Sequence, residues 1–138
     1  MAVCALLMWL VAFPRLDFAL PGREVFAGIF LIAALIVGIS AVLGFHRAKT
    51  TLNPLQPDAA SALVVRGIYR WTRNPMYLAM LLVLIAWACI VANVAALAIL
   101  PLFVAYLNRF QIAPEERALQ ARFGGEFEQY KRTVRRWL

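Results

Sequence analysis

The sequence has little charge and few residues that bind metals. Only 15% of its 138 residues are charged and 64% are hydrophobic, whereas about 25% charged is usual in soluble domains. It contains a single histidine, His46, and two cysteines, Cys4 and Cys89, which lie in separate apolar stretches without a second ligand at metal-binding spacing. These shortages predict a one-domain membrane protein with buried cysteines and no metal site.

The sequence also has few acidic residues. It contains 14 Lys and Arg but only 7 Asp and Glu, so the net charge is +7. Most basic residues lie in residues 46–73 and from Arg109 onward. Lys and Arg accumulate on the cytoplasmic side of membrane proteins, so both segments and the C-terminus should be cytoplasmic. This bias and attraction to anionic lipids account for the charge, and no nucleic-acid partner is expected.

The long uncharged runs predict an all-α, polytopic transmembrane bundle of about four helices. Residues 25–45 carry no charge, and at about 1.5 Å per residue they can cross a hydrocarbon core of about 30 Å. Residues 76–107 are too long for one straight span, so they should form a helical hairpin that turns at Asn93, with Pro101 kinking its second arm. The apolar N-terminal run is a short fourth helix, with three helices as the alternative.

A stripe of small residues marks one side of the first long span. Ala34, Gly38 and Ala41 recur at helical spacing, which allows a neighbouring helix to approach closely. The neighbour could be another helix of the chain or a second copy, so a homodimer is also consistent with this pattern.

The C-terminal region predicts two amphipathic helices at the cytoplasmic face. Pro114, with Glu115 and Glu116 in the first turn, is a typical helix start. Gly124 and Gly125 should end that helix. A second helix would carry an apolar face surrounded by basic residues and should lie on the anionic leaflet. The apolar face consists of Phe127, Tyr130, Val134 and Trp137, and the basic residues are Lys131, Arg132, Arg135 and Arg136.

The run RNPMY, residues 73–77, predicts another helix start, because Asn is a good N-cap and Pro suits the first helical position. This start and the one at Pro114 would bring free N–H groups, arginines, tyrosines and two glutamates to one face. Such a set suits a small zwitterion with an aromatic part, since guanidinium groups bind a carboxylate and carboxylates bind an ammonium.

Two motifs of the sequence are GIYRWTRNPMYLAM and PEERALQARFGGEFEQYKRTV. Together they resemble the membrane-embedded methyltransferase family that includes isoprenylcysteine carboxyl methyltransferases and phosphatidylethanolamine N-methyltransferases, in a short bacterial form. The family pattern is G-x-Y-x-x-x-R-H/N-P-x-Y, a hairpin, E-E-x-x-L and F-G-x-x-Y-x-x-Y. It is matched by Gly67, Tyr69, Arg73, Pro75, Tyr77, Glu115, Glu116, Leu119, Phe123, Gly124 and Tyr130. Asn74 replaces a histidine and Phe127 replaces a tyrosine of that pattern.

The resemblance implies an integral protein of the bacterial inner membrane that binds S-adenosylmethionine at the cytoplasmic face. Residues 1–52 would be the N-terminal membrane helices and residues 53–138 the cofactor-binding core of a single domain. The implied cofactor-binding residues are Tyr69, Arg73, Asn74, Pro75, Tyr77, Glu115 and Glu116.

The implied methyl acceptor is a lipid, a lipid-linked group or another lipophilic small molecule. Arg109, with Gln111 nearby, would lie on the acceptor side and could position a carboxylate, whereas an amine acceptor needs a base such as Glu116. Two other functions remain open. Sterol reductases of the membrane have a related C-terminal half that binds NADPH, and a non-catalytic membrane subunit could keep the same fold.

Overall fold

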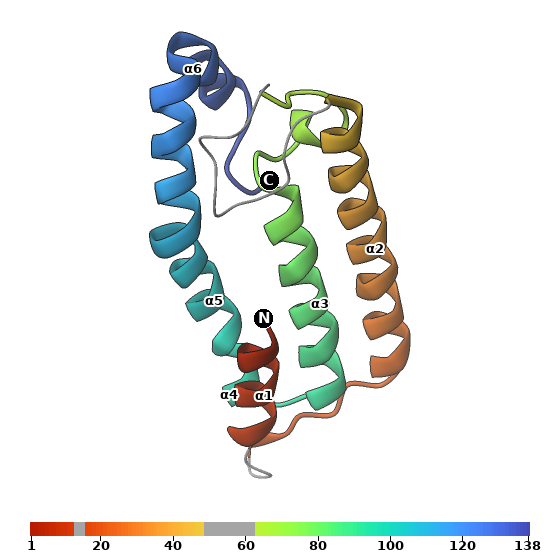
Figure 1. Ribbon diagram of the computed structural model, residues 1–138. Helices are drawn as coiled ribbons and strands as arrows, with labels where there is room; N and C mark the ends of the chain where they lie inside the picture. The colour runs from red at the N-terminus through yellow and green to blue at the C-terminus, as the bar shows by residue number, and fades with distance from the viewer. Residues whose placement is uncertain (13–15, 49–62) are drawn as a thin grey trace.

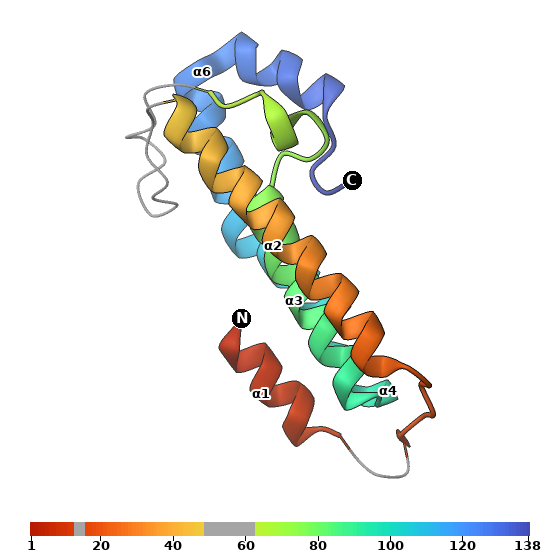
Figure 2. The same ribbon diagram turned by 90° about the vertical axis from the view of Figure 1, so that its right-hand side faces the viewer.

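The computed structural model describes residues 1–12, 16–48 and 63–138, and these ranges are helical (Figure 1). No β-strand forms within them, and the all-α prediction is confirmed. Three long helical segments lie side by side, and a short N-terminal helix packs at one end (Figures 1 and 2). The α-helices are α1 (Ala2–Leu10), α2 (Arg23–Ala48), α3 (Pro75–Val91), α4 (Val94–Leu97), α5 (Ile99–Leu107) and α6 (Ala113–Thr133).

Two helical segments of the described ranges are long and apolar enough to cross a membrane, Arg23–Arg47 and Val94–Thr133. α3 is also apolar but has only 17 residues, and α1 has 9 residues. At about 1.5 Å per residue, α1 covers about half of a hydrocarbon core. Length and composition therefore support two spans and do not by themselves give four.

The predicted hairpin turn at Asn93 is confirmed. Ala92 has a left-handed backbone (φ 47°, ψ 48°) that ends α3, and the Asn93 side chain caps α4 by accepting a hydrogen bond from the Ala95 N–H at 3.0 Å. The Asn93 amide also donates to Asp17 at 2.6 Å. The turn is therefore tied to the segment that connects α1 and α2.

The second arm of the hairpin is interrupted close to Pro101, as predicted. The interruption falls at Ala98, between α4 and α5, within the turn that precedes Pro101, because a proline has no N–H to donate to that turn. Pro114, by contrast, does not start the predicted separate helix. A single π-helical turn, η4 (Asn108–Ile112), joins α5 to α6 with helical backbone angles throughout, and the expected free N–H groups at Pro114 belong to a continuous helix.

α6 bends sharply at Gly124, as the glycine pair predicted. Gly124 has φ 51°, a conformation that side chains with a Cβ rarely adopt. After this bend the second part of α6 folds back over the end of the bundle (Figure 2). It ends at Thr133, and Val134 is extended.

The predicted second helix forms after the bend, but its apolar face does not lie on the leaflet, and that part of the prediction is wrong. Phe127, Tyr130 and Val134 are buried within the protein. They pack against Leu63, Leu119 and Phe123, because the Gly124 bend turns them toward the bundle.

The small-residue stripe of α2 packs on α3 inside the chain. Ala34 is 5% exposed and Ala41 0%, and a Cβ added at Gly38 would lie 3.6 Å from the Ala79 side chain. The stripe is thus occupied by α3 and does not provide a contact to a second copy. A homodimer through another surface stays a prediction.

Candidate active site

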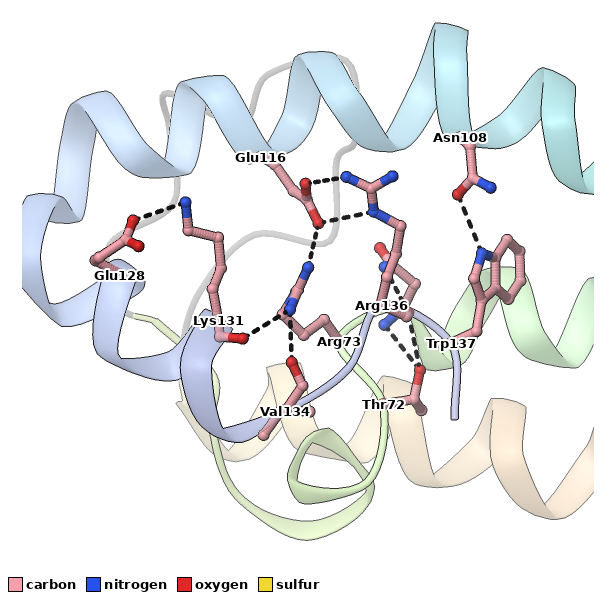
Figure 3. A network of polar contacts seen from close by, with 10 residues as sticks. Thr72, Arg73, Asn108, Glu116, Glu128, Lys131, Val134, Arg136 and Trp137 are labelled. Atoms are coloured by element: carbon pink, nitrogen blue, oxygen red, sulfur yellow. Dashed lines mark hydrogen bonds and ion pairs between the residues drawn. The ribbon is translucent and has the colours of Figure 1, made fainter.

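A group of charged residues is held together where α3 begins and α6 passes. Glu116 of α6 accepts hydrogen bonds from Arg73 Nη2 at 2.8 Å and from Arg136 through both of its carboxylate oxygens. Figure 3 shows the two guanidinium groups converging on this carboxylate. The side chains of Arg73 and Glu116 are only 12% and 17% exposed, so solvent screens this pair weakly.

The last residues of the chain form what we call the C-terminal strap (residues 131–136), which lies against residues 72–74. Arg73 donates from its side chain to the carbonyl oxygens of Lys131 and Val134, and its backbone N–H donates to the Arg135 carbonyl at 3.0 Å. Thr72 donates to the Arg136 carbonyl at 3.3 Å. These bonds place the strap over the N-terminal end of α3 (Figure 3).

Asn74 is the residue before α3, as predicted, but its side chain makes no capping hydrogen bond. Its amide instead donates to the Arg136 carbonyl at 2.9 Å, and its backbone N–H donates to the Thr72 hydroxyl at 3.2 Å. The predicted side-chain cap is therefore wrong, because the hydrogen bond from the amide nitrogen to the strap holds the side chain in an orientation in which its oxygen does not cap α3.

Glu115 has different surroundings from its neighbour Glu116. Its carboxylate accepts a hydrogen bond from the Tyr77 hydroxyl, and no arginine or lysine pairs with it in the described part of the chain. Of the two adjacent carboxylates, Glu116 is neutralised by two arginines and Glu115 is held by a neutral phenol.

These residues surround a small hollow of about 120 Å³, which we call the inner cavity. Most of the predicted cofactor-binding residues line it, together with apolar side chains from α2 and α6. The lining residues used below are Tyr69, Arg73, Asn74, Glu115, Glu116, Leu63, Val64, Leu119, Phe127 and Tyr130. Pro75 is buried, and Tyr77 reaches the cavity through Glu115.

Two residues that line the inner cavity carry buried hydrogen-bond donors. Burial raises the pKa of the Tyr69 phenol well above its usual value, so the phenol keeps its proton at neutral pH. Arg73 Nε is buried and has no hydrogen-bond partner among the described residues. A buried donor without a partner is costly and favours a ligand that can accept from it.

Arg109 is not brought to this cavity. It lies exposed on the π-helical turn η4, and neither it nor Gln111 lines the cavity. The Gln111 side chain does interact with the Tyr77 hydroxyl. Arg70 is exposed as well.

The sequence did not reveal the role of the strap. Arg136 was expected on a lipid-facing basic surface, but its guanidinium binds Glu116, and these hydrogen bonds raise the pKa of Arg136 above its ordinary value. Trp137 donates to Asn108 of the π turn at 3.0 Å. The contacts to the strap join residues 58 to 64 positions apart, mostly through backbone carbonyls, and no local pattern marks such contacts.

Comparison with known proteins places the chain in a family. The sequence model of the phospholipid methyltransferase family matches residues 23–126, from the start of α2 to just beyond the Gly124 bend. The chain belongs to the phospholipid methyltransferase family. The match contains the cavity residues Tyr69, Arg73, Asn74, Glu115, Glu116 and Leu119, and it ends before Phe127, Tyr130 and the strap.

One relative is an uncharacterized protein of Haemophilus influenzae, which is 46% identical over 63 residues. The aligned region is 46% of this chain and all of that protein. No solved structure matches the chain. Family membership identifies a membrane methyltransferase as the general class of this protein.

Proposed function

We propose that this protein transfers a methyl group from S-adenosylmethionine to a lipid or lipid-linked acceptor at the cytoplasmic face of the membrane. The proposal rests on the inner cavity. Arg73 and Glu116, which are 43 residues apart in the sequence, meet there with Asn74 and Glu115 in a methyltransferase family member. Glu115, Glu116 and Arg73 match the motifs that gave the resemblance to the isoprenylcysteine methyltransferase group.

The chemistry of the cavity residues fits the polar parts of S-adenosylmethionine. Glu115 would hold the ammonium group, Arg73 Nε would donate to the carboxylate, and Asn74 and Tyr69 would bind the nucleoside. The cavity of about 120 Å³ is below the roughly 300 Å³ of small-molecule sites, so it must widen to admit the whole cofactor. The bound cofactor supplies an electrophilic methyl group on a sulfonium.

The chain itself has to hold the acceptor close to that methyl group and exclude water. In-line displacement is fast when the reacting atoms are held at about 3–3.5 Å in a dry site. Leu119, Phe127 and Tyr130 supply the apolar lining. No metal ligand set is needed for this reaction, and the described residues contain no group of three or more candidate ligands.

The acceptor determines whether a base is required. A carboxylate acceptor needs none, whereas an amine must lose a proton. Glu116 is poorly suited to this role, because both of its oxygens are engaged by arginines. Glu115 is assigned to the ammonium group of the cofactor, so a water molecule would have to take the proton of an amine acceptor. Arg109 lies outside the inner cavity, so it could position an acceptor only from the membrane side.

We also propose the topology expected from the sequence, an inner-membrane bundle of four membrane helices in one domain. In this arrangement α3 completes a short span, α1 enters part of the bilayer, and the strap faces the cytoplasm. Arg47 lies in the last turn of α2, and Arg66 and Arg70 precede α3, so all three arginines would lie at the same membrane face as the strap.

Titration calorimetry of the detergent-purified protein with S-adenosylhomocysteine, and with NADPH as the comparison, tests the proposal. We expect saturable binding of S-adenosylhomocysteine alone. Binding of NADPH alone would identify a membrane reductase. A folded sample that binds neither would favour a non-catalytic subunit, and both results contradict the proposed methyl transfer.

A further inference from the structure

A second and larger hollow lies between the C-terminal end of α2 and the short helix η3 (Gly67–Arg70). We call it the outer groove, and its volume is about 810 Å³. Leu63 and Val64 line both the outer groove and the inner cavity. A molecule in the groove would therefore be separated from the inner cavity by the side chains of these two residues.

The charge of the outer groove has one sign. Arg47 and Arg66 are the charged residues among its described lining, which contains no Asp or Glu. Both arginines are exposed, and neither forms an ion pair within the described part of the chain. Two unpaired guanidinium groups favour an anion, and arginine binds phosphate oxygens particularly well.

The walls of the outer groove are apolar and open to the surroundings. Trp71 is 73% exposed, Leu43 44% and Val65 37%. Large apolar side chains beside arginines at the end of a membrane helix are suited to a ligand with a hydrocarbon part and an anionic head. A free phosphate or nucleotide would leave these walls uncovered.

The cofactor does not fit this groove by charge. S-adenosylmethionine carries a sulfonium and an ammonium group, and its cations would face two arginines there. The acidic residues that suit those cations, Glu115 and Glu116, lie in the inner cavity. A zwitterionic lipid would likewise bring its ammonium group toward the arginines.

We propose that the outer groove binds one anionic phospholipid. Its phosphate lies between Arg47 and Arg66, and its hydrocarbon chains run along Leu43, Val65 and Trp71 into the bilayer. The binding stands on the groove alone. It does not depend on the proposed function.

Native mass spectrometry of the detergent-purified protein can test this site. Phosphatidylglycerol and phosphatidylcholine with the same acyl chains are titrated onto the wild type, and we expect one tightly bound phosphatidylglycerol. The double variant Arg47→Gln/Arg66→Gln should weaken phosphatidylglycerol binding by about tenfold or more, because two charge-assisted contacts are lost. Arg132→Gln/Arg135→Gln removes the same charge from two exposed arginines outside the groove and should leave the affinity nearly unchanged.

Two results would overturn the proposal. Equal affinity of the wild type for both lipids would remove the charge argument, and that comparison requires no variant to fold. An equal loss in both double variants would indicate general attraction to the basic face. The affinity for S-adenosylhomocysteine should be unchanged in Arg47→Gln/Arg66→Gln, so loss of the lipid site and failure of the proposed function give different results.

Discussion

Glu115 and Glu116 show how two identical adjacent residues acquire different roles. Consecutive positions on a helix point about 100° apart, so one carboxylate reaches Arg73 and Arg136 and the other reaches Tyr77. Glu116 holds α6, the start of α3 and the strap together. Glu115 is left able to interact with a ligand.

Glu116→Gln should destabilise the protein more than Glu115→Gln. Loss of the Glu116 charge leaves Arg73, which is 12% exposed, without its counter-ion, and we expect a cost of roughly 2–3 kcal/mol, somewhat less than for a fully buried pair. Glutamine at position 115 can still accept from Tyr77, so its cost should be within about 1 kcal/mol. Thermal unfolding in detergent measures both.

The same two variants separate stability from ligand binding. Glu115→Gln should lower the affinity for S-adenosylhomocysteine by about tenfold or more at nearly unchanged stability, since an ammonium group loses its carboxylate. The control is the affinity of the wild type, measured at the same temperature, at which both proteins are still folded. Normal binding by Glu115→Gln would mean that this carboxylate does not contact the ligand.

At the scale of elements, close approach between α2 and η3 depends on Gly44. A Cβ added at this position would lie 3.1 Å and 3.3 Å from ring atoms of Tyr69, which is closer than side chains normally pack. Gly38 faces Ala79 at an ordinary 3.6 Å. The two glycines of one helix thus differ in the space around them.

Gly38→Ala should therefore stabilise the protein by up to about 1 kcal/mol, because alanine favours a helix over glycine. Gly44→Ala gains the same helix propensity but must displace the Tyr69 ring, and overpacking costs roughly 1–3 kcal/mol. We expect a lower melting temperature for Gly44→Ala than for Gly38→Ala. The reverse order would show that Tyr69 adjusts freely.

The strap is the second element whose attachment can be tested. Asn74→Asp replaces a donor by an acceptor opposite the Arg136 carbonyl and should loosen residues 131–136. Hydrogen exchange should then accelerate at the Arg73 amide, which donates to the Arg135 carbonyl. Gln129→Glu makes the same change of amide to carboxylate at an exposed position and should have no such effect.

At the scale of the whole molecule, the two ends of the bundle are closed by different contacts. The Asp17–Asn93 hydrogen bond fixes the end where the α3–α4 turn lies, and the Glu116 ion pairs fix the other end. The proposed orientation places the second end in the cytoplasm.

Cysteine labelling in spheroplasts tests this orientation. In a background with Cys4 and Cys89 replaced by alanine, we expect Pro21→Cys to react with an impermeant thiol reagent from outside. Arg132→Cys should react only after the membrane is permeabilised. Both positions are exposed, so the opposite labelling pattern would invert the proposed topology.

The sequence predicted the features that depend on local patterns. Hydrophobic runs gave the long helices, Asn93 gave the hairpin turn, and Gly124 gave the bend in α6. Five of the seven residues expected to bind the cofactor line the inner cavity, and their binding of the cofactor stays a prediction. The continuity of α5 and α6 was missed, because proline is disfavoured inside a helix and no local pattern revealed the π turn that precedes Pro114.

The strap could not be predicted for a different reason. A basic run with aromatic residues favours the membrane surface when judged alone, and only the Gly124 bend returns it to the bundle. Asn74 was misjudged for the same reason. Its preference for capping was outweighed by a carbonyl group contributed from 62 residues away.

The strap is recognised largely through its main chain. Thr72, Arg73 and Asn74 all donate to carbonyl oxygens of residues 131–136, and every amino acid supplies a carbonyl oxygen. Apart from Arg136 and the buried Val134, the side chains of the strap can therefore change while these bonds remain, whereas adding or removing one residue between Thr133 and Arg136 would misplace the carbonyl groups. In related proteins we expect the length of this segment to be maintained more strictly than its amino-acid composition. A relative with a deletion or insertion in this segment should therefore cover the inner cavity with a different part of its chain.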